Sequence, residues 1–158
     1  MNTAYVALGA NLGDPRATVL AAFAALANLP ESRVARCSSL YRTAPVGILD
    51  QPDFVNAVAV LETSLTADAL LDALLDIEAR FGRIRRERNG PRTLDLDLLL
   101  YDDIELDLPH LTLPHPRLHL RAFVLYPLAD LAPDLVIPGR GTLAAWLPAV
   151  ANQGIVRL

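Results

Sequence analysis

The segment Leu94–Tyr101 constrains the fold most, because acids and leucines alternate along its first half. In an extended strand, Asp95 and Asp97 project from one face with their Cα atoms roughly 6.5 to 7 Å apart, while the leucines around them point to the other face. The leucines can then enter a core, and the two carboxylates converge. Two adjacent buried carboxylates are costly without a counterion, and a divalent cation relieves that cost. We therefore expect a strand from Asp95 to Tyr101 with a metal site at its start.

Five arginines fall within residues 83–92, shortly before this strand, with Glu87 as the only acid among them. Arginine binds phosphate in a bidentate geometry and stays charged. A charge run alone is more often a solvated loop, but the two aspartates that follow favour one polyphosphate site, in which Mg²⁺ takes some of its oxygens from phosphate. The five residues are Arg83, Arg85, Arg86, Arg88 and Arg92.

Composition narrows the class of protein. The chain has 158 residues, 53% apolar and 20% charged, so we expect a single soluble domain over residues 1–158. The formal net charge of −4 argues against nucleic-acid binding. All 14 basic residues are arginine, and the absence of lysine excludes a P-loop and a lysine Schiff base. Any bound phosphate must be held by arginine, backbone amides or metal.

The single cysteine and the absence of targeting signals narrow the class of protein and its location. Cys37 is the single cysteine, which excludes a disulfide framework and a cysteine zinc site, and we expect it to be a small buried residue. The N-terminus lacks the basic and apolar regions of a signal peptide, and no apolar run reaches membrane-spanning length. These features predict a cytoplasmic protein without membrane contact. Nothing in the sequence indicates an obligate protein partner.

The secondary-structure signals follow the order strand, helix, strand, strand, helix, strand. Asp14 and Thr66 are candidate N-caps of the two helices, and Gly82 suits a left-handed turn at the end of the second. This is the split βαβ order of ferredoxin-like α+β domains, so we expect a four-stranded antiparallel sheet with helices on one face and an irregular C-terminal segment. The expected strands cover residues 3–8, 34–43, 54–63 and 95–101, and short helices are expected near residues 117–120 and 143–151.

The histidines lie close together in the proline-rich part of the chain, as His110, His115 and His119. Their spacing allows a zinc site, but Pro114 and Pro116 break any helix that would align His115 with His119. A histidine that donates to a phosphate, or one that caps a turn, fits this segment better.

Phe54 and Asn56 are two residues apart at the start of an expected strand, so they share a face. An aromatic ring beside an amide could hold and read a flat heterocycle, although phenylalanine in a strand more often belongs to the core. By themselves, these two residues do not decide between a ligand site and a core.

Taken together, these segments resemble the 6-hydroxymethyl-7,8-dihydropterin pyrophosphokinase family, whose members move pyrophosphate from ATP to a pterin alcohol in folate biosynthesis. The most specific segment is Gly90–Leu99, with its Gly-Pro-Arg-x-x-Asp-x-Asp pattern. The resemblance extends from the first strand to about Pro138. The other segments that carry it are Tyr5–Gly13, Ser39–Pro45, Gln51–Ala57 and Leu111–Arg117.

The resemblance implies a ferredoxin-like fold, ATP as co-substrate and two Mg²⁺ ions bridged by Asp95 and Asp97. It implies that Arg83 and Arg92 assist the transfer. The residues implied to line the nucleotide site are Arg85, Arg86, Leu98, Thr112, His115 and Arg121. The residues implied to hold the pterin are Thr43, Pro45, Val46, Phe54, Asn56 and Phe123, with the two phenylalanines on opposite faces of the ring.

Two positions depart from the family pattern. Some members carry a tryptophan just before Gly-Pro-Arg and a glutamine on the preceding helix, where this chain has Asn89 and Leu75.

The alternatives to a pyrophosphokinase are another Mg²⁺-dependent nucleotidyl- or glycosyltransferase, which also uses paired acids, and a ferredoxin-like RNA-binding module. The acidic total and the missing aromatic RNA signature oppose the RNA-binding module.

Overall fold

The computed structural model describes residues 1–45, 50–82 and 93–158. The strands of its main sheet are β1 (Asn2–Ala10), β2 (Ser32–Cys37), β3 (Tyr41–Thr43), β4 (Phe54–Thr63), β5 (Asp95–Tyr101) and β10 (Ile155–Arg157). The helices are α1 (Pro15–Ala27), α2 (Ala67–Arg80), α3 (Ala122–Leu131) and α4 (Leu143–Val150), with a 3-10 turn η1 (Leu118–Leu120). Two small strand pairs join β6 (Leu106–Leu108) to β7 (Leu111–Leu113) and β8 (Val136–Ile137) to β9 (Gly141–Thr142).

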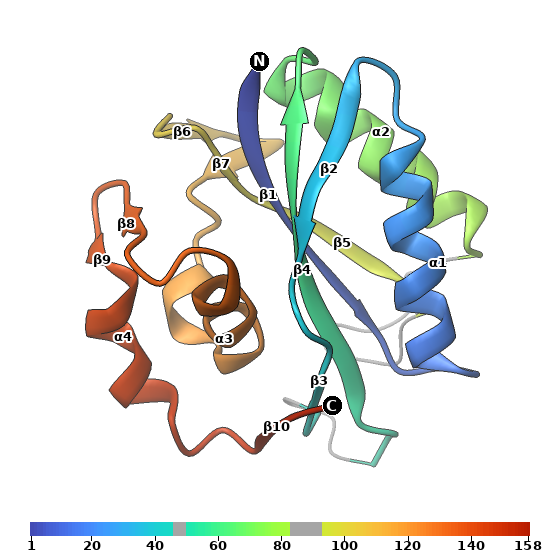
Figure 1. Ribbon diagram of the computed structural model, residues 1–158, viewed down its shortest axis with the longest axis vertical. Helices are drawn as coiled ribbons and strands as arrows, with labels where there is room; N and C mark the ends of the chain where they lie inside the picture. Colours follow the sequence, from blue (N-terminus) through green and yellow to red (C-terminus); the bar gives the residue numbers. More distant parts are fainter. Residues whose placement is uncertain (46–49, 83–92) are drawn as a thin grey trace.

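The main sheet is antiparallel throughout, with the order β10-β3-β4-β1-β5 and with β2 also paired to β4. Helices α1 and α2 cover one face, and α3 and α4 lie on the other (Figure 1). Strand β4 is therefore buried on both sides. Its Ala57, Ala59 and Leu61 pack in the layer with α1 and α2, while Val58 and Val60 pack in the layer with α3.

The two predicted helices begin and end where their capping residues lie. The Asp14 side chain accepts the N–H of Ala17 at 3.1 Å at the start of α1, and the Thr66 hydroxyl accepts the N–H of Ala69 at 3.1 Å at the start of α2. Gly82 has a φ of 77° just beyond α2, which is the left-handed conformation expected there. These boundary predictions are confirmed.

A β-bulge divides β5 into two parts. Val6 pairs with Leu98 and Tyr5 pairs with Leu100, so Leu99 is an extra residue without a partner on β1. As a result Leu98 faces α1 and α2, whereas Leu99 and Leu100 both face α3. Asp97 alternates with Leu98 and therefore opens on the α3 side of the sheet. The prediction that the leucines between the acids enter the core is confirmed.

The predicted four-stranded sheet with helices on one face is wrong in two respects. The strand expected over residues 34–43 is interrupted, because the register shifts between Val34 and Arg36 and the chain then continues as the separate strand β3. A further strand, β10, joins the edge of β3 from the C-terminal segment. Among the described residues the sheet has six strands, and both of its faces carry helices.

The short helices predicted near residues 117–120 and 143–151 are confirmed as η1 and α4, but the C-terminal segment is less irregular than expected, because α3 also forms there. Helix α3 contains Pro127, which removes one helical hydrogen bond, yet its Leu125, Leu128 and Leu131 are buried against the sheet. This burial outweighs the loss of the hydrogen bond at the proline. The sequence did not predict the helix, because the proline is a local signal against it and the burial depends on residues far away in the sequence. Cys37 is exposed on the peripheral strand β2, so the expectation that it is buried is also wrong. Among the described helices, none has the length and apolarity needed to cross a membrane.

Helix α1 provides a test of this packing, because it carries a buried and an exposed leucine. Leu26 is fully buried, whereas Leu20 is 52% exposed. We expect Leu26→Ala to lower the free energy of unfolding by about 2–5 kcal/mol, because it leaves a cavity under the sheet. Leu20→Ala should change it by no more than about 0.5 kcal/mol. Urea unfolding of both variants measures the difference, and equal effects would contradict the placement of α1.

Candidate active site

The candidate site lies on the α3 side of the sheet, where the end of β1 runs between the starts of β4 and β5. Gly9 pairs with Asn56 of β4 on one side and with Asp95 of β5 on the other. Ala7, two residues earlier, pairs with Asp97. Neighbouring strands are about 4.8 Å apart, so the backbones of Asn56 and Asp95 are separated by roughly 10 Å. The residues of β1 between the amide of Asn56 and the two carboxylates are therefore Ala7 and Gly9, which have no large side chain.

The amide of Asn56 is fixed over Gly9. Its Nδ2 donates to the hydroxyl of Thr43 at 2.7 Å, and both side chains are buried. A Cβ atom at Gly9 would lie 2.6 Å from Oδ1 of Asn56, so glycine is required there for the close approach. Thr43 and Asn56, which were predicted to hold a pterin, are thus brought into direct contact.

The two predicted aromatic residues come from different elements. Phe54 is the first residue of β4, pairs with Thr43 and shares the sheet face of Asn56. Phe123 is the second residue of α3, which covers that face. The guanidinium carbon of Arg121 lies 5.3 Å from the centre of the Phe123 ring, a cation–π contact. Both aromatic side chains are partly buried.

His115 lies on the opposite side of the site, next to β5. Its backbone N–H donates to Leu99 O at 2.9 Å, and its Nδ1 accepts the N–H of Arg117 at 3.2 Å. With Nδ1 as acceptor, the proton of the neutral ring is on Nε2, which can donate to a ligand. Burial lowers the pKa of His115, the charge of Asp97 raises it and the charge of Arg121 lowers it. Arg121 therefore acts on both the phenylalanine and the histidine sides of the site.

A cavity of about 380 Å³ opens beside these residues, between α2, β5 and β7. It is lined by four of the predicted residues, Asp97, Leu98, Thr112 and His115. Most of its other walls are apolar, as is typical of sites that hold a flat base. The remaining lining residues are Leu71, Leu75, Glu78, Leu96, Pro109, His110, Leu111 and Pro116.

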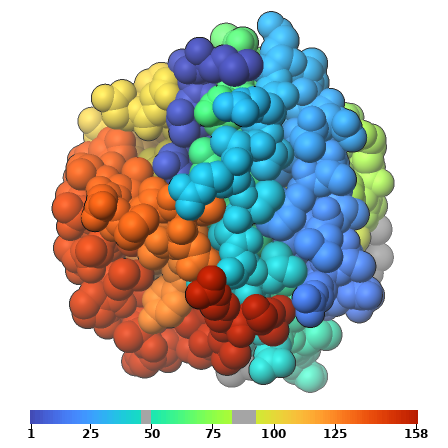
Figure 2. Space-filling view, in the orientation of Figure 1, coloured from blue at the N-terminus to red at the C-terminus, as the bar shows by residue number. Residues whose placement is uncertain are grey.

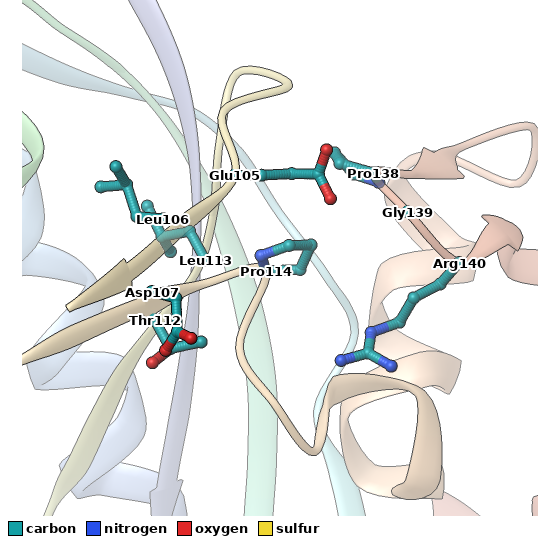
Figure 3. A pocket seen from close by; sticks show the side chains of 9 residues that line it. All are labelled: Glu105, Leu106, Asp107, Thr112, Leu113, Pro114, Pro138, Gly139 and Arg140. Atoms are coloured by element: carbon teal, nitrogen blue, oxygen red, sulfur yellow. The ribbon is translucent and has the colours of Figure 1, made fainter. Parts of the chain in front are cut away.

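A second cavity, of about 370 Å³, lies between the β6–β7 pair and the turn before β9. Figure 3 shows Glu105 and Arg140 reaching toward it from opposite sides. Thr112 is the only predicted site residue in its lining, and neither Asp95 nor Asp97 belongs to it. Asp97 lines the first cavity, so the candidate chemistry is assigned to that cavity.

The donor set at the start of β5 suits a hard divalent cation. Asp95 and Asp97 are both partly buried and supply carboxylate oxygens from one face of the strand. In the described part of the chain, no cluster of three or more His, Cys, Asp or Glu residues is suitable for a metal. Two carboxylates fit Mg²⁺, which keeps several waters and takes further oxygens from phosphate. They do not form the closed protein cage of a structural zinc site.

Two buried polar residues support the site and were not predicted to do so. Glu78 of α2 accepts the N–H of Leu96, the residue between the two aspartates, at 2.7 Å. Its position on the apolar face of α2 was the signal that could have identified it. Asn11 donates from Nδ2 to Gln51 Oε1 and to Pro52 O, both at 2.9 Å. This pair of bonds joins the segment after β1 to the segment before β4.

The remaining predicted residues divide into two groups. Pro45 is partly buried and lies just beyond β3. The others are outside the described residues. They are Val46 and the arginines Arg83, Arg85, Arg86 and Arg92.

The contact between Gly9 and Asn56 can be tested with a double-mutant cycle. We expect Gly9→Ala to lower the free energy of unfolding by about 1–3 kcal/mol, because the added methyl displaces the Asn56 amide from its bond to Thr43. In an Asn56→Ala background the same change should cost much less, because the clashing atom is gone. Urea unfolding of the four proteins measures this difference, and an equal cost in both backgrounds would reject the contact.

The state of His115 predicts a pH dependence of stability. Because its pKa in the folded protein is below the ordinary 6.5, the unfolded chain binds more protons in the window just below pH 6.5. The free energy of unfolding should therefore fall as the pH drops through this window in metal-free protein. Urea unfolding at several pH values measures the slope, and His115→Gln should reduce it. An NMR titration that gives His115 a pKa above 6.5 would contradict the prediction.

Comparisons with known proteins agree with this geometry. A family model described as 7,8-dihydro-6-hydroxymethylpterin-pyrophosphokinase (HPPK) matches residues 5–133. A 2-amino-4-hydroxy-6-hydroxymethyldihydropteridine pyrophosphokinase of Pseudomonas aeruginosa is 54% identical over 98% of this chain and 95% of its own length. The enzyme of the same name from Haemophilus influenzae is 43% identical over 100% of this chain and 99% of its own length. The folic acid synthesis protein fol1 of Schizosaccharomyces pombe is 42% identical, and the match covers 21% of its length.

Solved structures share the fold. An HPPK-DHPS in complex with substrates aligns over 99% of this chain and 46% of its own, with a TM-score of 0.77 and 14% identity. A Plasmodium falciparum HPPK-DHPS with pteroate aligns over 93% of this chain and 42% of its own, with a TM-score of 0.75 and 15% identity. This chain thus spans less than half the length of either structure. The extent of the family match, together with close relatives that align over nearly their whole length, shows that the chain belongs to the 7,8-dihydro-6-hydroxymethylpterin-pyrophosphokinase family.

Proposed function

We propose that this chain transfers pyrophosphate above Gly9, from a nucleotide held on the β5 side to a pterin held on the β4 side. Membership in the family makes the chain an ATP-dependent pyrophosphokinase of folate biosynthesis, whose acceptor is 6-hydroxymethyl-7,8-dihydropterin. The observation that carries the proposed geometry is the row of Asn56, Gly9 and Asp95 across three adjacent strands. This row sets an amide on one side of Gly9 and a carboxylate on the other, with no side chain on β1 between them.

In this proposal the pterin lies between the sheet and α3. Asn56 and Thr43 hydrogen-bond its polar edge, because an amide and a hydroxyl together supply donors and acceptors. The rings of Phe54 and Phe123 stack on its two faces, and stacking suits a flat heterocycle. Pro45 and Val46 complete this side of the site. The contact of Arg121 with Phe123 leaves the other face of that ring for the pterin.

ATP is proposed to place its base in the apolar cavity and its phosphates toward Asp97. Thr112 and Leu98 line the cavity, and His115 donates from Nε2 to a phosphate oxygen. Arg121 lies within electrostatic range of His115 and provides positive charge where the two substrates meet. Arg83, Arg85, Arg86 and Arg92 supply further guanidinium groups, which suit a triphosphate because they bind phosphate in a bidentate manner.

Asp95 and Asp97 would hold Mg²⁺, and we propose two ions. When bound, these ions neutralise charge on the phosphates and align them. The residues of the chain then orient the pterin hydroxyl in line with the β-phosphorus, so that AMP leaves. We assign no protein base, because phosphoryl-type transfer depends mainly on positioning and on electrostatic stabilisation of the phosphates. ATP and the pterin are the proposed partners, and neither nucleic acid nor a membrane has a part in the reaction.

Substitution of the two acids tests this assignment. We expect Asp95→Asn and Asp97→Asn to lower turnover by at least about a hundredfold with little change in the melting temperature, because each removes a metal-binding charge. The matched control is Asp107→Asn, an exposed acid on β6 in the second cavity. Separation of nucleotides after reaction with ATP, Mg²⁺ and the pterin should give AMP and pterin diphosphate in equal amounts. Near-normal turnover of either variant would remove that residue from the metal role, and ADP as product would reject the reaction.

A further inference from the structure

Gln153 lies in the turn between α4 and β10, twenty residues beyond the end of the family match. Its side-chain amide makes one hydrogen bond to the first residue of α3 and one to the last residue of η1. Oε1 accepts the N–H of Ala122 at 2.9 Å, and Nε2 donates to Leu120 O at 3.1 Å. Arg121, the residue that precedes α3, makes no capping bond with its own side chain. Gln153 therefore caps α3 from a distant part of the chain.

The next residue of the same turn contacts the other side of the site. Gly154 O accepts the N–H of Ala44 at 3.2 Å, and Ile155 pairs with Thr43 as β10 joins the sheet. Gly154 has a φ of 71°, which glycine adopts without strain. In Figure 2 the C-terminal segment, in dark red, lies on the surface between the orange and the cyan parts of the chain. Two successive residues thus connect α3 with β3.

The groups that this turn connects are adjacent to the proposed pterin residues. Ala122, which Gln153 caps, directly precedes Phe123, while Ala44 directly follows Thr43. Any movement of the start of α3 relative to β3 therefore changes the distance between the two walls of the pterin site. Stacking and in-line attack both depend on that distance, and a misplacement of about 1 Å can lower the rate of an enzyme by about a hundredfold.

We propose that Gln153 is a positioning residue for pterin binding, which holds the start of α3 at the separation from β3 that the ring requires. The inference rests on the proposed function, in which Phe123 and Thr43 contact the pterin. Gln153 itself acts through the backbone of residues 120–122. A helix cap that served stability alone would affect the fraction of folded protein and would not distinguish between the two substrates.

Steady-state kinetics of Gln153→Ala test the proposal. We expect the KM for the pterin to rise about tenfold and the KM for ATP to rise by a clearly smaller factor, about threefold or less, because Phe123 loses its fixed position while the nucleotide site is affected only through Arg121. Gln153→Glu keeps an acceptor for the Ala122 N–H but turns a carboxylate oxygen toward Leu120 O, so it should restore only part of the pterin KM. The matched control is Asn152→Ala, an exposed amide residue of the same turn, which should leave both KM values unchanged.

Melting temperatures and active-site titration of the variants separate the possible outcomes. If Gln153→Ala lowers kcat in proportion to the loss of folded protein, with both KM values unchanged, the role is structural only and the proposal is overturned. Equal increases in both KM values would also overturn it. Phe123→Ala identifies a failure of the underlying function. If that variant leaves the pterin KM unchanged, the proposed pterin site is wrong, whereas an increase for Phe123→Ala without one for Gln153→Ala rejects only the inference.

Discussion

The antiparallel pairing of β1 between β4 and β5 is the interaction on which the rest of the site depends. This register places Gly9 beside both Asn56 and Asp95, so two groups that are far apart in sequence become neighbours across one strand. A shift of one residue would turn every side chain of β1 to the opposite face. The buried Val6 and Leu8 oppose such a shift, because they would leave the core. Core packing thus fixes the register, and the register fixes the site.

The α3 face of the sheet has two uses. Over much of its length, Val58, Val60 and Leu99 pack against α3 and form an ordinary apolar layer. At the end of β1 and at the starts of β4 and β5, polar and small residues replace the apolar ones, and this layer gives way to the site. Helix α3 serves both uses, because its later residues bury leucines while its second residue is Phe123. The same element therefore stabilises the sheet and carries a residue of the proposed pterin site.

The sequence predicted the parts of the molecule that local patterns determine. The alternation around Asp95 and Asp97 was sufficient to place both acids on one face, and Asp14 and Thr66 marked the helix starts through their capping side chains. Helix α3 was missed because Pro127 dominates its local signal, whereas tertiary burial determines its structure. The pairing of β10 and the bonds of Gln153 could not be predicted either, since both depend on residues roughly 30 to more than 100 positions away.

The bulge at Leu99 has a consequence for how β5 can vary. A single unpaired residue shifts the alternation by one position. The residues before it and the residues after it therefore follow different patterns of which side chain points to which face of the sheet. Tyr101 reaches the Asn2 side chain and Leu65 O only because of this change of phase. Loss of Leu99 would therefore give a regular strand, in which Leu100 and Tyr101 keep their partners Tyr5 and Ala4 and Asp97 keeps Ala7. The first part of β5 thus presents the two acids, and the part after the bulge consists of residues buried in the two apolar layers.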